Sequence, residues 1–232
     1  MDGRIGFILI LWVVVLAFLS MGLPKGIQAQ PSEEHDVCFR WGFGAITGPS
    51  HDRRLTAVTQ DRVLKTGDQL KMLVELKKRC FVYVISHTSD HELYLLFPYD
   101  LGQFDQDYVL SKKYMIPGGD MWLELDQHTG LETFYLLASA TRLIELETLL
   151  EKYEKAHASE RKAVKEAVLS EIRDLKKRHK KLSTSAERPV PIGGNVRGMT
   201  QEEKTAIPDI DALAGEVSTT NFYGRTFTID HR

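Results

Sequence analysis

Short runs of apolar residues, each ended by a turn signal, follow one another through the middle of the chain. Residues 70–76 alternate apolar and polar side chains after the turn signal Thr66-Gly67-Asp68, and a period of two residues is the pattern of a half-buried strand. The runs 80–85 and 93–97 are apolar, β-branched and aromatic, and the polar stretch 87–91 separates them. We therefore expect these two runs to form a hairpin at the centre of a core.

Further strands are expected after this hairpin. Residues 114–117 end at the glycine pair 118–119, and the apolar positions of 122–125 form a second short run. Gly130 then precedes the run 133–138. Several short strands punctuated by turns favour a mainly β fold, either an antiparallel β-sandwich or a partly open barrel.

From Thr141 onward the apolar period changes to that of an amphipathic helix. The predicted apolar face consists of Leu143, Leu146, Leu150, Tyr153, Val164, Val168, Ile172 and Leu175. The stretch 155–159 is either a break between two helices or the middle of one. The segment is therefore expected to be one long helix or a helical hairpin.

The segment that follows the helix, residues 183–218, is polar and rich in proline and glycine. It has no sustained period, and we expect a loop or flexible segment there. The last residues, 219–232, have the composition of one more strand, which needs a sheet to join. The expected organisation is an N-terminal segment over 30–53, a β-sandwich-like domain over 54–140 to which the last strand returns, and a helical insertion over 141–182.

The first residues have the layout of an export signal. Asp2 and Arg4 precede an apolar run from Ile5 to Leu23, and Ala29 is a small residue at a plausible cleavage position. This layout predicts a signal peptide over residues 1–29, although the run is also long enough to be an uncleaved anchor in the bacterial inner membrane. Either alternative places the rest of the chain in the periplasm or another extracytoplasmic space.

The charge balance excludes few classes of protein. The formal net charge is -2, which gives no overall attraction to nucleic acid or to anionic lipid. The basic run 176–181 has no aromatic residues for base stacking, so we interpret it as a solvated helix end. We expect no nucleic-acid partner, and membrane contact only through an N-terminal anchor.

Cys38 and Cys80 are the only two cysteines. In an oxidising compartment they are candidates for a disulfide, which would stabilise the fold by about 4 kcal/mol in the chain-entropy model. Two buried free thiols are the alternative. No Cys-x-x-Cys motif is present, so neither a redox site nor a structural zinc site is indicated.

Several of the motifs named above, taken together, resemble a known family. They are Thr66-Gly67-Asp68, Phe81-Val82-Tyr83-Val84, Leu95-Leu96-Phe97-Pro98, Ile116-Pro117, Gly130-Leu131-Glu132-Thr133 and Leu136-Leu137-Ala138-Ser139. Their order and spacing are similar to the bacterial family labelled domain of unknown function 4384, over roughly residues 54–139 and the last strand. The resemblance implies a β-sandwich-like accessory module, found alone after export signals or fused to signalling and protease-like domains. It carries no catalytic residues to transfer, and Tyr99 replaces the asparagine that often follows the Leu-Phe-Pro step.

Two sets of side chains were weighed as metal ligands. His87, Asp90 and His91 have a ligand-like spacing, but a hairpin tip does not place both imidazoles on one face. The carboxylates of Asp100, Asp105, Asp107 and Asp120 lie in or beside loops, and their spacing matches no calcium loop. We expect no metal and no other cofactor.

Catalytic motifs are also missing from the sequence. The adjacent pairs Ser50-His51 and Ser86-His87 would point to opposite faces of a strand. There is no Gly-x-Ser-x-Gly elbow and no His-Glu-x-x-His motif. We therefore expect no enzymatic activity and no catalytic residues.

The stretch between Tyr99 and Tyr108 mixes aromatic side chains with carboxylates. Tyr99, Asp100, Phe104, Asp105 and Tyr108 have the composition of a surface that binds a peptide or a glycan.

The apolar stripe of the predicted helix, with Leu146 and Leu150, must be buried either on its own sheet or on a partner. The chain is thus expected to be an exported, non-enzymatic binding or scaffolding module of the cell envelope that contacts a protein or glycan. The alternative is a hydrolase or metal-dependent enzyme, which a deep pocket holding two or more of His87, His91, Asp100 and Asp105 would favour.

Overall fold

The computed structural model describes residues 36–49, 52–59, 61–180, 186–188 and 209–232. The predicted signal peptide or anchor over residues 1–29 lies outside the described residues, as does most of the predicted loop over 183–218. Within the described ranges, no helix combines the length and the apolar character needed to cross a membrane.

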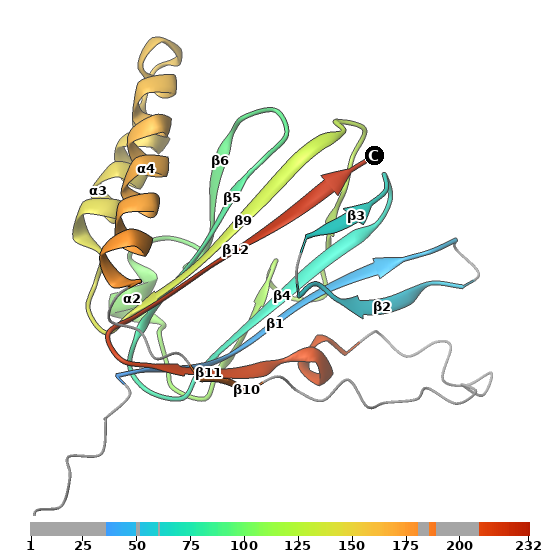
Figure 1. The fold of residues 1–232 in the computed structure, drawn as a ribbon, viewed down its shortest axis with the longest axis horizontal. Helices are drawn as coiled ribbons and strands as arrows, with labels where there is room; N and C mark the ends of the chain where they lie inside the picture. Colours follow the sequence, from blue (N-terminus) through green and yellow to red (C-terminus); the bar gives the residue numbers. More distant parts are fainter. Residues whose placement is uncertain (1–35, 50–51, 60, 181–185, 189–208) are drawn as a thin grey trace, which may run out of the picture. The chain divides into compact units, whose positions relative to one another are not determined.

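Two β-sheets pack face to face (Figure 1). The strands of the first sheet, sheet A, are in order β10 (Ala186–Arg188), β11 (Gly215–Thr219), β1 (Val37–Thr47), β4 (Gln69–Leu76) and β7 (Lys113–Ile116), with β2 (Arg54–Ala57) paired to β1 and β8 (Leu123–Glu124) paired to β4. The strands of sheet B are β3 (Arg62–Leu64), β12 (Phe222–His231), β9 (Gly130–Ser139), β5 (Phe81–His87) and β6 (Leu93–Phe97). Neighbouring strands are antiparallel, except that β3 and β12 are parallel. The predicted class is confirmed: the fold is mainly β with helices, and its sheets do not close into a barrel.

The core between the sheets is built around aromatic side chains that meet across them. The ring of Phe43 on β1 lies 5.2 Å from that of Phe134 on β9 and 5.4 Å from that of Phe227 on β12, in edge-to-face geometry. Trp41, also on β1, lies 6.0 Å from Phe227. Such pairs add about 0.5–1.5 kcal/mol each beyond the area they bury, so β1 is central to the attachment of sheet A to sheet B.

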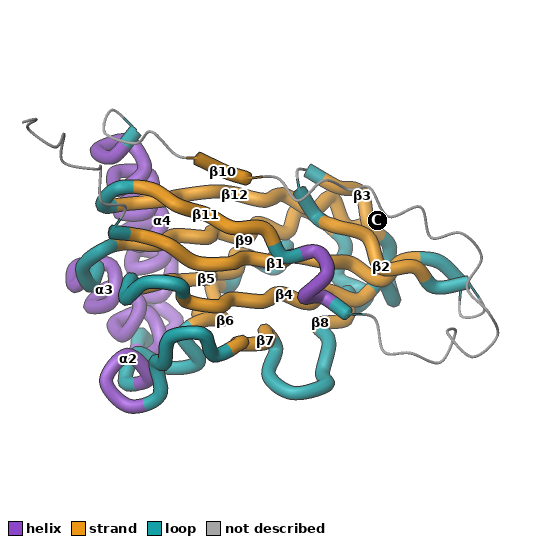
Figure 2. Tube along the Cα trace, turned by 90° about the horizontal axis from the view of Figure 1, so that it is seen from below, coloured by secondary structure: helices purple, strands orange, loops and turns teal. Residues whose placement is uncertain are grey.

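The helical segment is a hairpin inserted between two paired strands. Helices α3 (Ile144–Lys155) and α4 (Ala158–His179) follow β9, and β12 then pairs antiparallel with β9 along its whole length. The two helices cover one end of the outer face of sheet B (Figures 1 and 2). Their apolar face joins that sheet in a second core, whose members include Tyr83, Leu137, Leu146, Val168 and Phe222.

Several strands lie where no individual strand was predicted, among them β1 and β11. Residues 30–53 were expected to be an N-terminal segment outside the β-domain, yet β1 is the central strand of sheet A and pairs with β4 and β11. Within the predicted loop over 183–218, β11 pairs with the first half of β1. β11 has only Val217 and Thr219 buried, so its sequence carries almost no apolar pattern.

The glycines of β1 explain why this strand was missed. A Cβ on Gly44 would lie 2.7 Å from Cδ1 of Ile210, and one on Gly42 would lie 3.1 Å from the Ile210 carbonyl oxygen. Ile210 begins a 3₁₀ turn, Ile210–Leu213, that packs on this strand. Glycine is unfavourable in a strand interior, but here it provides the room for that close contact.

Candidate functional site

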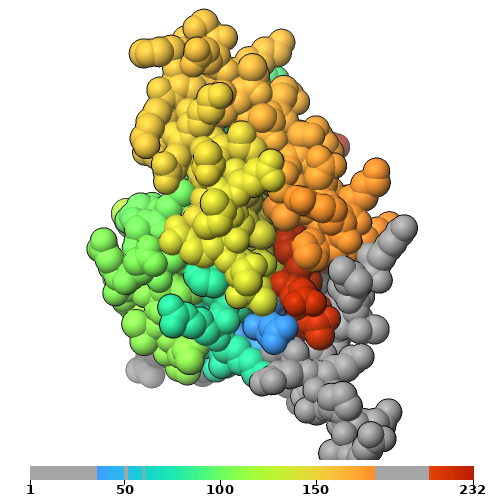
Figure 3. Space-filling view, turned by 90° about the vertical axis from the view of Figure 1, so that its left-hand side faces the viewer, coloured from blue at the N-terminus to red at the C-terminus, as the bar shows by residue number. Residues whose placement is uncertain are grey.

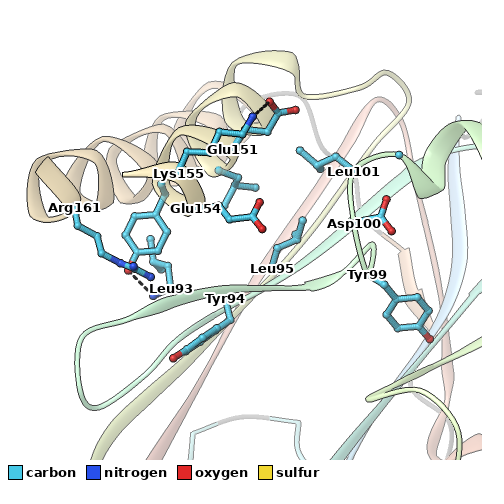
Figure 4. Close-up of a pocket in the computed structure, with 13 residues that line it drawn as sticks. Leu93, Tyr94, Leu95, Tyr99, Asp100, Leu101, Glu151, Glu154, Lys155 and Arg161 are labelled. Carbon is cyan, nitrogen blue, oxygen red and sulfur yellow. Dashed lines mark hydrogen bonds and ion pairs between the residues drawn. The ribbon is translucent and has the colours of Figure 1, made fainter. Parts of the chain in front are cut away.

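A groove of about 560 Å³ opens beside strand β6, under helix α3. Its walls come from the strand, from the loop after Pro98 and from the helical hairpin (Figure 4). The lining residues are Leu93, Tyr94, Leu95, Tyr99, Asp100, Leu101, Gly102, Leu150, Glu151, Tyr153, Glu154, Lys155 and Arg161.

The strand that borders the groove is an edge of sheet B. Among the described strands, β6 pairs with β5 only. The N–H of Thr88 donates to the carbonyl oxygen of Glu92 at 3.0 Å, whereas the N–H of Leu93 donates away from β5, to the hydroxyl of Tyr153 at 3.1 Å. The register of the two strands shifts only after the Ile85–Leu95 pair. Because backbone groups alternate sides along a regular antiparallel stretch, we infer that the N–H and C=O of Leu95, like those of Leu93, point away from β5 toward the groove.

Tyr153 and Arg161 fix the helical hairpin to the start of this strand. The Tyr153 hydroxyl donates to Oε2 of Glu92 at 2.7 Å, and Nε of Arg161 pairs with the same oxygen at 2.9 Å. The guanidinium of Arg161 also lies 4.7 Å over the Tyr153 ring, a cation–π contact. This end of the groove is therefore preorganised by contacts within the chain.

The groove carries exposed carboxylates and exposed tyrosines. Figure 4 shows the carboxylates of Asp100 and Glu154 on opposite sides of the space above Leu95. Tyr94 and Tyr99 are 49% and 48% exposed. The Tyr99 hydroxyl donates to the carbonyl oxygen of Met115 at 2.6 Å, and burial of part of its ring raises the pKa of Tyr99.

The two basic side chains of the groove already have anionic partners. Nζ of Lys155 lies 3.4 Å from Oε2 of Glu151, and Arg161 pairs with Glu92. Asp100 and Glu154 thus remain as the carboxylates without a cationic partner among the described residues, and they make the open centre of the groove acidic.

Three of the predicted site residues line this groove, namely Tyr99, Asp100 and Leu150. Their loop begins at Phe97-Pro98, whose peptide bond is cis. The side-chain amide oxygen of Gln103 accepts from the Tyr99 N–H at 2.8 Å. This hydrogen bond sets the path of the loop between Pro98 and α2 (Gln103–Gln106).

The other predicted residues of the loop lie outside the groove; Phe104 is buried and Tyr108 is half-buried, which corrects the expectation of one continuous binding surface. The Phe104 ring packs 5.2 Å from the ring of Tyr83. The Tyr108 hydroxyl accepts from the Val82 N–H at 2.9 Å, and burial raises the pKa of Tyr108 strongly. Asp105 is exposed, and its Oδ2 pairs with Arg142 at 3.1 Å. These side chains hold the loop against sheet B.

The helix positions proposed for a partner are also buried. Leu146 is 0% exposed and Leu150 is 7% exposed, because both pack in the core between α3 and sheet B. The apolar stripe is therefore packed on the chain's own sheet, and of these two residues only Leu150 reaches the groove.

Sequence reasoning missed the residues that give the groove its shape and charge. The edge position of Leu93–Phe97 is a property of strand order, which no local pattern reveals. Glu154 and Arg161 lie beside the predicted apolar stripe, where charged residues are the norm for any amphipathic helix. Only the pairing of β6 and the placement of α3 bring them together.

The side chains weighed as metal ligands do not converge. The rings of His87 and His91 lie 6.1 Å apart, and burial, together with Lys165 and His91, lowers the pKa of His87. Of His87, His91, Asp100 and Asp105, only Asp100 lines the groove. Across the part of the chain that the structure describes, no three His, Cys, Asp or Glu side chains are placed to hold a metal ion.

The two cysteines are not bonded to each other. Sγ of Cys80 lies in the core, 3.9 Å from the Cys38 carbonyl oxygen. Val37 and Phe39 point into that core, so the alternation of β1 turns the half-buried Cys38 side chain to the other face of sheet A. The possible disulfide is therefore absent from this structure, because the two thiols lie on opposite sides of a strand.

Comparison with known proteins gives a single family. The model of the family described as Domain of unknown function (DUF4384) matches residues 63–142, which confirms the resemblance. The match runs from β3 to the residues just before α3, so it includes β6 and the loop that borders the groove. The chain matches no curated protein and no solved structure.

Proposed function

We propose that this chain is an exported, non-enzymatic binding module of the bacterial cell envelope. Residues 63–142, which are similar to the DUF4384 family, form part of that module. Its site is the groove beside β6, and its partner is an extended segment of another envelope protein. The predicted export signal over residues 1–29 supports the compartment. The observation that supports this choice of site is that β6 is an edge strand with backbone groups directed away from β5, toward the groove.

An edge strand offers a row of backbone donors and acceptors that a second chain can extend. The N–H and C=O of Leu95 point away from β5, and α3 leaves a groove of about 560 Å³ over this edge. A peptide paired with β6 would lie between the loop after Pro98 and the helical hairpin. Glycan hydroxyls can bind single backbone groups, but a peptide strand also matches the spacing of an outward N–H and C=O in strand register, so the geometry favours a peptide.

The charges indicate which side chain the bound segment presents. Alternate residues of an added strand would point toward α3, where Asp100 and Glu154 face each other across the groove. A lysine or arginine at one such position would lie between the two carboxylates, and charge-assisted hydrogen bonds of this kind are about twice as strong as neutral ones. The neighbouring residues of the segment would contact the exposed face of Tyr94.

A displayed library of random peptides, selected on the purified full-length protein, tests this proposal. We expect selected peptides to alternate in hydrophobicity and to share one basic position. The double substitution Asp100→Lys and Glu154→Lys should weaken their binding at least about tenfold, the equivalent of about 1.4 kcal/mol. Asp61→Lys combined with Asp174→Lys, two exposed changes outside the groove, is the matched charge control and should leave binding unchanged.

A backbone variant separates strand addition from simple charge attraction. Leu95→Pro removes the outward N–H but no hydrogen bond of the β5–β6 ladder, and proline is tolerated at such edge positions. Peptide binding should be lost in this variant but kept in Leu95→Ala, which loses the same side-chain packing under the helices and retains the N–H. Selection of no peptide above background, or equal binding by wild type and both groove variants, would contradict the proposal.

A further inference from the structure

The turn between β4 and β5 presents three consecutive cations at one end of the sandwich. Lys77, Lys78 and Arg79 are all exposed. The backbone N–H groups of Lys77 and Lys78 both donate to the Cys38 carbonyl oxygen at 2.9 Å. The turn is thus fastened to the start of β1, next to Asp36.

Two exposed apolar side chains lie beside these cations. Val109 and Leu110 are 53% and 49% exposed, and the next residue, Ser111, donates its N–H to the Leu76 carbonyl oxygen at 2.9 Å. Leu110 shares a shallow depression of about 450 Å³ with the three cations, Asp36 and Ala140. Figure 3 shows this end of the molecule, where the start of β1, the β4–β5 turn and the loop before β7 meet on one surface.

The charges around the turn leave an excess of cations. Nζ of Lys77 lies 2.5 Å from one carboxylate oxygen of Glu75, and the other oxygen is taken by Arg40 at 2.7 Å. In the depression itself, Asp36 is the one carboxylate among the described lining residues, against three basic side chains. Apolar side chains bordered by cations are the composition of surfaces that lie on anionic membranes.

In the sequence, this end of the molecule closely follows an apolar run long enough to span a bilayer. Asp36 follows the apolar run Ile5–Leu23 in the sequence, and the stretch from Leu23 to Asp36 reaches at most about 45 Å when fully extended. If the run stays in the membrane, the cationic turn cannot lie farther than this from the lipid surface. A tether of this length raises the local concentration of lipid at the turn.

We propose that this end of the molecule docks on the surface of an anionic lipid bilayer. Lys77, Lys78 and Arg79 contact the lipid phosphates, and Val109 and Leu110 enter the boundary between headgroups and acyl chains. The surface is separate from the groove beside β6 and does not depend on its function. It adds a second membrane contact to that of the N-terminal anchor. From the sequence alone, the anchor was the only membrane contact expected.

Tryptophan fluorescence of the full-length protein in vesicles tests the docking surface. Leu110→Trp places a reporter on the surface, and Leu131→Trp, 59% exposed at the opposite end of β9, is the matched control. Both variants also carry Trp12→Phe, so that the apolar run contributes no signal, and both keep the same tether. Quenching by brominated lipid is compared in vesicles of phosphatidylglycerol with phosphatidylcholine and in vesicles of phosphatidylcholine alone.

We expect the Leu110→Trp variant to be quenched more than the Leu131→Trp variant in the anionic vesicles and equally in the neutral ones. Adding Arg79→Ala should lower the docking equilibrium constant about fivefold, the effect of one cation near an anionic surface. Circular dichroism checks that each variant is folded. Equal quenching of the two variants in anionic vesicles, or the same difference in neutral vesicles, would overturn the proposal, as would capture of an acidic protein with no response to lipid.

Discussion

The hydroxyl of Tyr83 donates a hydrogen bond to Oε1 of Glu147 at 2.5 Å, where strand β5 meets the first turn of helix α3. Both residues are buried. The same hydroxyl accepts from the Leu143 N–H at 3.0 Å, and Arg142 pairs with the other carboxylate oxygen of Glu147 at 2.6 Å. One phenol thus satisfies a backbone donor and a buried carboxylate at the point where the helical insertion joins the sheet.

Tyr83→Phe should destabilise the protein by about 1–3 kcal/mol, because it leaves a buried carboxylate oxygen and a backbone N–H without this partner. Chemical denaturation followed by circular dichroism measures the change. Tyr135→Phe is the matched control, since Tyr135 lies on the neighbouring strand β9 and its hydroxyl has no hydrogen bond within the described residues. An equal loss in both variants would mean that ring packing, and not the hydrogen bond, carries the contribution of Tyr83.

Leu146→Ala should cost about 2–5 kcal/mol, the usual range for a cavity in a packed core, because Leu146 is fully buried between α3 and sheet B. Ile144→Ala, at an exposed position of the same helix, should change stability by less than about 0.5 kcal/mol. Thermal unfolding of the two variants decides the point. If Leu146→Ala were as stable as Ile144→Ala, the apolar stripe would not be packed on the sheet.

Acid should weaken the contact between β1, β4 and the 3₁₀ turn through Arg40. Burial opposes ionisation of Glu75, but hydrogen bonds from Lys77 and Arg40 outweigh it and hold its pKa below the ordinary value. A hydrogen bond from Lys113, with the Arg40 charge, lowers the pKa of Asp211. Because both folded-state pKa values are depressed, the stabilisation is fully present above the unfolded-state values and is lost as the pH falls below them and through the folded-state values.

The variant Arg40→Met checks this assignment. It should destabilise the protein by about 2 kcal/mol at pH 7 and by clearly less at pH 3. Arg54→Met is the control, because the pair between Arg54 and Asp52 is exposed and surface pairs contribute little. A stability deficit of Arg40→Met that does not shrink in acid would refute the ionic origin of the contact.

The two thiols should differ in reactivity toward a thiol reagent such as Ellman's reagent. Burial raises the pKa of Cys80 to about 11, and the thiolate is the reactive form. Cys38 is half-buried, and burial, with the charge of Glu216, raises the pKa of its thiol as well. We expect slow modification of Cys38 in the native protein and modification of Cys80 only after unfolding; a protein with no titratable thiol even when unfolded would instead contain the disulfide.

The local sequence pattern predicted the strands that are rich in apolar residues. The apolar positions of 70–76 and the apolar runs 80–85 and 93–97 correspond to β4, β5 and β6; β4 and β5 are buried along most of their length, which requires apolar side chains on both faces. The period change at Thr141 likewise precedes α3. β1 was not predicted because Gly42 and Gly44 are unfavourable in an isolated strand. They are glycines because the 3₁₀ turn packs too closely against them to leave room for a Cβ.

The candidate site could be predicted only in part, for a related reason. The composition of the loop around Tyr99 and Asp100 indicated a binding surface, and both residues line the groove. Phe104 and Tyr108 belong to the same aromatic stretch, but their side chains pack toward the core. Phe104 packs on the ring of Tyr83, and the Tyr108 hydroxyl accepts a hydrogen bond from the Val82 N–H. The groove itself is a product of strand order, since β6 lies at the edge of sheet B and α3 returns over it.

The last strand has a consequence for how the molecule is assembled. β12 lies between β3 and β9, and just beyond it the N–H of Arg232 donates to the Leu64 carbonyl oxygen while the Arg232 carbonyl oxygen accepts from the Thr66 N–H, both on the β3 side. Sheet B therefore has a gap in its middle until the final ten-residue strand is in place. Without β12, β3 would have no neighbour in sheet B and β9 would have one bare side, so sheet B cannot be completed before β12 has been synthesised.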